Sequence, residues 1–197
     1  MNRRTWIILG IILAVLFVGY RLTVGPYNNM VSMDESAGTQ WANVESAYQR
    51  RADLIPNLVN TVKGYAAHEA SVLEAVTQAR ANATSVKIDP KNLTPEALQK
   101  FQSAQDGLSS SLSRLLVVAE KYPDLKANQN FLELQSQLEG TENRINIERN
   151  KFNESVKEFN TYVRSFPNNI VAGMFGFVKK GYFEAATGSE KAPEVKF

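Results

Sequence analysis

The chain contains no cysteine and only one histidine in 197 residues. The absence of cysteine excludes disulfides, cysteine-ligated zinc sites and thiol catalysis. The single histidine, His68, begins a segment that resembles the zinc-protease motif H-E-x-x-H, but Val72 stands where the second histidine ligand is required. No serine has a histidine base at triad-type spacing, and no glycine loop resembles a phosphate cradle. The sequence therefore predicts neither an enzyme nor a metal or cofactor site.

A strong excess of one charge is also missing. The 22 lysines and arginines stand against 20 acidic residues, which gives a net charge of +2. This balance provides no broad basic surface, so no nucleic-acid partner is expected. Strand-type alternation and hairpin signals are absent as well, which leaves helices as the predicted elements.

The most informative feature that is present is an apolar run behind a short basic N-terminus, residues 1–5. The run begins at Trp6 and, continued across Arg21 to Val24, reaches the roughly 20 residues that span a bilayer. Since residues 16–21 contain no small-residue cleavage site, we expect an uncleaved anchor over 6–24 in place of a removable signal peptide. The predicted membrane-anchor residues are Trp6, Ile7, Ile8, Leu9, Ile11, Ile12, Leu13, Val15, Leu16, Phe17, Val18 and Tyr20.

The charges beside this run predict its orientation. Arg3, Arg4 and the terminal amine favour a cytoplasmic N-terminus, which sends the remaining chain to the outer or periplasmic side. Arg21 at the other end of the run weakens the asymmetry. The lipid bilayer is thus an expected partner, and the chain is expected to cross it once.

The remainder predicts an all-α fold, a bundle of three long helices over 27–184 followed by a polar, disordered tail over 185–197. Apolar residues at steps of three and four run from Tyr27 to Ala83, which favours one helix kinked at Pro56. The alternative is a break at Ala52-Asp53, with Asp53 as the N-cap. Three such helices with short connections are expected to pack as a long antiparallel bundle.

Capping residues place the other two long helices. Thr94 and Pro95 suit the N-cap and first helical positions of the second helix, which is expected to stop at Tyr122-Pro123. The third helix is expected to begin near Asn128 or Asn130 and to end before Phe166-Pro167.

A short apolar segment, Ile170 to Phe183, follows the third helix and is too short to span a bilayer. It could dock on the bundle as a fourth element, contact another subunit, or lie in the membrane interface with Lys179 and Lys180 toward the headgroups. The candidate oligomer or interface contacts in it are Ile170, Met174, Phe175, Phe177 and Tyr182.

Polar residues gather around Pro56 and on the third helix, where they could meet as one layer. Glu148 falls on the apolar stripe, and a buried carboxylate there requires a cation or donors. Arg50 or Arg51 is the expected partner. The layer either fixes the register of the helices or forms a docking site for a partner. Its candidate residues are Arg50, Arg51, Asp53, Pro56, Asn57 and Glu148.

Several motifs stand out along the helical part of the chain. They include Tyr27-Asn28-Asn29-Met30-Val31, Trp41-Ala42-Asn43-Val44-Glu45, Arg50-Arg51-Ala52-Asp53-Leu54-Ile55-Pro56-Asn57-Leu58-Val59 and Ala119-Glu120-Lys121-Tyr122-Pro123-Asp124-Leu125. With these motifs the chain resembles the LemA family of bacterial membrane proteins, over roughly residues 27–184. The resemblance implies an N-terminal membrane helix followed by long antiparallel helices, with no established catalytic activity. Family genes are often found near a membrane zinc metalloprotease of the HtpX type, which implies an accessory role in envelope upkeep.

Two functions fit these observations. The first is a non-catalytic scaffold or interaction protein, anchored in the bacterial inner membrane and self-associating as a homo-oligomer. The second is an accessory or adaptor subunit of a membrane metalloprotease in envelope protein quality control.

Overall fold

The computed structural model describes residues 3–184, so the predicted tail over 185–197 lies outside the described residues. Helices account for the fold, and no strand occurs within this range, which confirms the predicted all-α class. The elements are α1 (Arg3–Tyr65), α2 (Ala70–Ser85), the short 3-10 helix η1 (Pro90–Asn92), α3 (Pro95–Ala119), α4 (Pro123–Lys126), α5 (Gln129–Arg164) and α6 (Asn168–Phe175).

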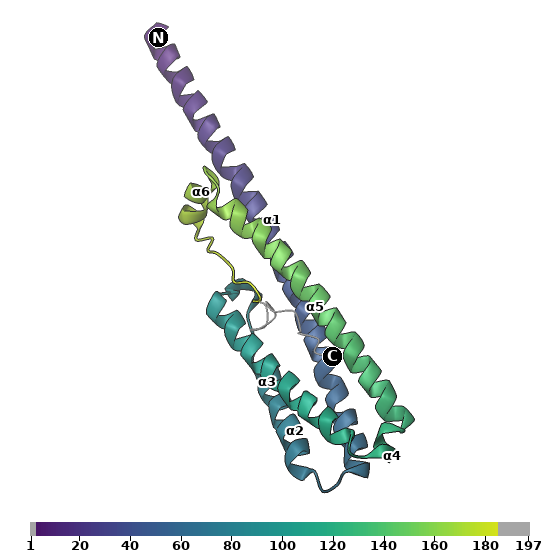
Figure 1. Ribbon diagram of the computed structural model, residues 1–197. Helices are drawn as coiled ribbons and strands as arrows, with labels where there is room; N and C mark the ends of the chain where they lie inside the picture. Colours follow the sequence, from purple (N-terminus) through teal and green to yellow (C-terminus); the bar gives the residue numbers. More distant parts are fainter. Residues whose placement is uncertain (1–2, 185–197) are drawn as a thin grey trace, which may run out of the picture.

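The long helices form two pairs. α1 packs along α5 and α2 packs along α3, while α1 also contacts α2 and so joins the pairs. Figure 1 shows that the N-terminal part of α1 extends alone beyond the bundle, and that α6 lies beside α1 where the bundle begins. This free part is long and apolar enough to cross a membrane.

α1 is longer than any other helix, with 63 residues that correspond to about 95 Å. It continues through Pro56, so the predicted continuity is confirmed and the alternative break at Ala52-Asp53 is wrong. The helix nevertheless ends at Tyr65, whereas the sequence predicted that it would reach Ala83. A turn over 66–69 reverses the chain, and the bundle has four long helices where three were predicted.

The apolar stripe in the sequence does not reveal this reversal, because α2 folds back onto the same core that α1 faces. Leu73 and Val76 of α2 lie in one buried cluster with Ile55 and Leu58 of α1. Residues on both sides of the turn therefore keep helical spacing and face inward, and periodicity alone does not reveal the change of direction.

The predicted caps of α3 and α5 are confirmed. The Thr94 hydroxyl accepts a hydrogen bond from the backbone N–H of Ala97 over 3.2 Å, and Pro95 is the first residue of α3. The Asn128 side chain accepts one from the N–H of Phe131 over 3.0 Å at the start of α5. α3 ends at Ala119, slightly before the predicted stop.

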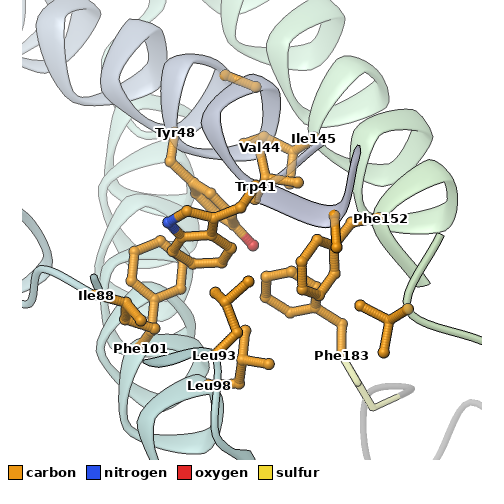
Figure 2. Packing of buried hydrophobic residues seen from close by; sticks show 13 residues of the cluster. Trp41, Val44, Tyr48, Ile88, Leu93, Leu98, Phe101, Ile145, Phe152 and Phe183 are labelled. Atoms are coloured by element: carbon orange, nitrogen blue, oxygen red, sulfur yellow. The ribbon is translucent and has the colours of Figure 1, made fainter. Parts of the chain in front are cut away.

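Aromatic rings fill the middle of the bundle. The Trp41 ring lies 5.1 Å from that of Phe101, 5.7 Å from Phe152 and 6.0 Å from Phe183, measured between centroids. Figure 2 shows these rings around Trp41. They come from α1, α3, α5 and the segment after α6, so four parts of the chain meet in one cluster.

Residues 176–184, which we name the C-terminal strap, run back from α6 to this cluster (Figure 1). Gly176, with φ of 75°, ends α6 in the left-handed region that glycine tolerates best. The side-chain amides of Asn160 and Asn153 on α5 each pair with one strap residue, donating to its carbonyl and accepting from its N–H, at 2.9 Å for all four bonds. The paired residues are Lys180 and Phe183.

Candidate functional site

The centre of the predicted polar layer is Arg51, which is only 3% exposed. Its guanidinium donates to Glu142 Oε2 on α5 over 2.9 Å, and to Gln105 Oε1 and Ser109 Oγ on α3 over 2.7 and 3.0 Å. One side chain thus joins three helices. Such a network pairs a buried charge and fixes the relative position of the helices it connects, while the Arg51 Nε is buried without a partner.

Tyr48 lies one turn before Arg51 on α1, with the guanidinium 5.0 Å from its ring centroid. Burial raises the pKa of the Tyr48 hydroxyl above its ordinary value, although the positive charges of Arg149 and Arg51 oppose the shift. Tyr48 therefore favours its neutral form in the folded chain.

A second, partly buried contact compensates for Pro56, whose backbone lacks the N–H that would bond to the Ala52 carbonyl. Arg80 of α2 supplies the replacement, because its Nε donates to the Ala52 oxygen over 2.7 Å. A charged donor from a neighbouring helix thus satisfies the carbonyl that the proline leaves free.

Glu148 is buried, with 1% exposure, but its predicted partners are wrong. Its Oε1 pairs with Arg144 over 2.8 Å and Lys151 over 3.2 Å, both on α5 itself. Arg50 is exposed on α1, and Arg51 bonds to Glu142 in place of Glu148. Residues one turn away on the same helix therefore pair with Oε1, a spacing that allows side chains to meet, while Oε2 is buried without a hydrogen-bond partner.

The remaining residues of the layer lie on the outer side of α1. Arg50, Asp53, Pro56 and Asn57 are exposed, and Arg50 and Asp53 line a hollow of about 630 Å³ between α1 and α5. A second hollow, of about 430 Å³, adjoins it and contains Asn57. We name their combined surface the lateral groove. It is lined by Asn43, Ser46, Ala47, Gln49, Arg50, Asp53, Leu54, Asn57, Asn60, Thr61, Asn130, Glu133, Leu134, Gln137 and Arg144.

The predicted polar layer is thus divided by the structure. Arg51 and Glu148 point inward and bond to side chains of this chain, which is the geometry that the register interpretation requires. Arg50, Asp53 and Asn57 face solvent, which is the geometry that a docking site requires.

The apolar segment after α5 docks on the bundle by one face only. Val171 and Ala172 are buried against Met30 and Phe159, and Phe177 packs against the same cluster. Phe177 therefore makes an internal contact and is partly buried. The opposite face and its flanking residues stay exposed, and we name them the proximal apolar surface: Phe166, Ile170, Met174, Phe175 and Val178.

One prediction for the lysines of this segment is wrong. Lys180 is buried, with its Nζ 2.7 Å from Asp34 Oδ1, so it does not point toward lipid headgroups, whereas Lys179 is exposed. Tyr182 lies in the C-terminal strap and is exposed, so it stays a candidate interface contact.

Some structural residues were not singled out as site candidates from the sequence. Gln105 and Asn160 are polar residues at buried positions on helix stripes, and that pattern is the signal by which they could have been found. Arg80 carries no such signal, since its partner is a backbone carbonyl on another helix.

His68 lies exposed in the turn between α1 and α2. Within residues 3–184, no group of three or more His, Asp or Glu side chains is arranged to hold a metal ion.

Comparison with known proteins identifies the family. The model of the LemA family matches residues 40–197. The chain belongs to the LemA family. This match confirms the family resemblance, and with the apolar N-terminal helix it describes a membrane-associated helical protein.

Several curated proteins are similar to this LemA family chain. Magnetosome protein MamQ 2 of Paramagnetospirillum magneticum is 27% identical over 175 residues, which are 80% of this chain and 64% of the relative. Magnetosome protein MamQ of Magnetospirillum gryphiswaldense is 28% identical over 174 residues, with the same coverage of 80% and 64%. Protein LemA of Metamycoplasma hominis is 23% identical over 178 residues, which are 89% of this chain and 78% of the relative. The chain thus spans about two thirds of the length of the magnetosome relatives, at 64%.

Proposed function

We propose that this protein is a non-catalytic scaffold, anchored in the bacterial inner membrane by a single crossing, whose copies associate through the lateral groove. The observation that carries the proposal is the continuity of α1, which runs as one helix from the apolar segment to Tyr65. A continuous helix transmits the position of the anchor to the far end of the bundle. Binding surfaces on it are therefore held at fixed heights above the bilayer.

The chemistry of the lateral groove suits a second copy of the same chain. It carries both signs of charge, since Arg50, Arg144 and Asp53 line one hollow and Glu133 lines the other. Two copies anchored in one membrane stand parallel, so a two-fold axis along the membrane normal brings equal heights together. Arg50 of one copy then lies at about the same height above the membrane as Asp53 of the other copy.

Apolar contact is available at the same place. Leu54 lines both hollows of the groove and is partly exposed, and Ile147 is exposed one turn from Arg144 on α5. An apolar centre with charged residues at its rim is the usual composition of a protein interface. The names of the relatives, three for the magnetosome and one for LemA, specify no reaction, which is consistent with a scaffold.

The absence of cysteine in the sequence allows a direct test. Leu54→Cys is introduced into the full chain, and native membranes are treated with a short bis-maleimide crosslinker. We expect a covalent dimer. The matched control is Val117→Cys, an exposed apolar residue on α3 outside the groove, which should stay monomeric on the gel.

Two results would overturn the scaffold proposal. One is a monomer at position 54 combined with a monomeric mass in mild detergent. The other is co-purification of a membrane protease in place of sister copies, which would favour the adaptor function.

The orientation is part of the proposal, with Arg3 and Arg4 on the cytoplasmic side and the bundle on the outer side. A reporter that is active only outside the cytoplasm, fused after Phe197, should be active. An inactive reporter would reverse the orientation.

A further inference from the structure

The proximal apolar surface lies beside the place where α1 leaves its apolar segment. Val24 is the last residue of that segment, and Tyr27 follows three residues later, about 4.5 Å along the helix axis. The ring of Tyr27 packs against that of Phe175, with 4.7 Å between centroids. α6 is therefore at the level of the first residues beyond the predicted membrane span.

The end of α5 brings a second apolar residue to the same end of the bundle. The Tyr162 hydroxyl accepts a hydrogen bond from Asn29 over 3.0 Å, which fixes the register of α5 against α1. From Tyr162 the antiparallel helix runs toward the anchor and ends at Arg164. Phe166 follows in the turn before α6, and it is 82% exposed.

α6 is apolar on both sides, which is unusual for a helix at the surface of a soluble bundle. Val171 and Ala172 face the bundle, while Ile170 and Met174 face outward, Met174 with 71% exposure. Two apolar sides of a helix each need apolar surroundings. The bundle covers only one of them.

The thickness of a bilayer indicates that lipid lies against the exposed side of α6. The polar headgroup layer adds about 5–8 Å to each side of the hydrocarbon core. The 4.5 Å step from Val24 to Tyr27, about three helical rises, lies within this layer. The proximal apolar surface is therefore at the depth where interfacial helices bury their apolar face.

We propose that the proximal apolar surface binds the bilayer that α1 crosses, with α6 lying in the boundary between headgroups and acyl chains. Phe166, Ile170 and Met174 recur every fourth residue and form the lipid-facing row. Arg164 and Lys179 are exposed on either side of α6 and suit anionic headgroups. The bundle is then attached to the membrane at two points, and its tilt relative to the bilayer is fixed.

The test measures the depth of Met174 in the full chain. Met174→Cys is labelled with a nitroxide, since the natural sequence offers no other thiol, and the protein is placed in vesicles of phosphatidylethanolamine and phosphatidylglycerol. Collision rates with oxygen, which enters lipid, and with a water-soluble nickel chelate are compared. Val117→Cys, near the C-terminal end of α3, is the aqueous control, and Leu13→Cys is the control within the span.

We expect the ratio of oxygen to nickel collisions at position 174 to be several-fold above that at 117 and below that at 13. Ile170→Cys should give the same result as Met174→Cys. A ratio at 174 equal to that at 117, with a lipid-like value at 13, would overturn the inference and leave the anchor intact. A second result would also overturn the inference. If the label at 174 is shielded from both reagents, and if its spectrum is broadened by a spin–spin interaction that disappears when unlabelled protein is added, a second copy of the chain covers α6. An aqueous value at 13 would overturn both the anchor and this inference.

Discussion

The Nε of Arg80 donates a hydrogen bond to the carbonyl oxygen of Ala52 over 2.7 Å. This carbonyl has no partner within its own helix, because Pro56 lacks a backbone N–H. The contact explains how α1 passes through a proline without ending. α2 returns antiparallel along α1 and carries the missing donor to the right place. The turn over 66–69 and the continuity at Pro56 are therefore two parts of one arrangement.

Arg80→Met should lower the free energy of unfolding by about 1–3 kcal/mol, because the Ala52 carbonyl is left without a donor. In a Pro56→Ala background the loss of stability caused by Arg80→Met should be smaller by about 1 kcal/mol or more, since the new N–H at position 56 can donate to the Ala52 carbonyl. Urea unfolding followed by circular dichroism measures both values. Arg50→Met, which removes an exposed arginine of α1, is the control and should change little. Equal costs in the two backgrounds would contradict the assignment of Arg80.

The role of Arg51 separates the two interpretations of the polar layer. Arg51→Met should lower the free energy of unfolding by about 1–3 kcal/mol, because Gln105, Ser109 and Glu142 lose their shared donor. Crosslinking at Leu54→Cys should persist in this variant under conditions where it is still folded, since Arg51 faces away from the lateral groove. A variant of unchanged stability that no longer forms the crosslinked dimer would favour docking over register.

Tyr48 predicts a loss of stability at alkaline pH. Burial raises the pKa of its hydroxyl in the folded chain, so the unfolded chain releases the proton at lower pH than the folded one. The contribution of Tyr48 is therefore complete below the ordinary tyrosine pKa of about 10 and is lost as the pH rises through the higher folded value. Melting temperatures measured across this range should fall less steeply for Tyr48→Phe than for the natural chain. Parallel curves for the two proteins would show that Tyr48 does not carry the effect.

The sequence predicted the features of this fold that depend on local chemistry. Thr94 and Asn128 cap their helices as expected, because an N-cap needs only a side-chain acceptor beside the first turn. Continuity through Pro56 was also predicted, from the apolar stripe on both sides of the proline. These are properties of short stretches of chain.

What the sequence did not predict depends on which segments meet in space. The reversal at 66–69 keeps the apolar phase, and the pairing of Arg51 with Glu142 follows from the register of two helices that periodicity leaves open. The C-terminal strap shows the same limit. Phe183 is separated from Trp41 by most of the chain, yet the two rings stack with an interplanar angle of 16°.

The strap offers a test of packing by two glycine substitutions. A Cβ at Gly181 would lie 2.8 Å from the Cα of Pro95 and 2.9 Å from Leu98 Cδ1. The strap backbone is also bonded there, since the N–H of Gly181 donates to the Leu93 carbonyl over 2.8 Å. Because the atoms contacted at Pro95 belong to the backbone of α3 and cannot rotate away, the added methyl group has to displace the strap. Gly181→Ala should therefore lower the free energy of unfolding by about 1–3 kcal/mol.

Gly140→Ala is the matched control, because the same methyl group is added on α5 where no atom lies within 4 Å. It should raise stability by about 0.5–1 kcal/mol, the usual gain when alanine replaces glycine inside a helix. Urea unfolding compares the two variants, and amide hydrogen exchange at Phe183 reports on the strap alone. Exchange at Phe183 should accelerate in Gly181→Ala and stay unchanged in Gly140→Ala. If Gly181→Ala kept both its stability and slow exchange at Phe183, the strap could not pack against α3 as closely as these distances require.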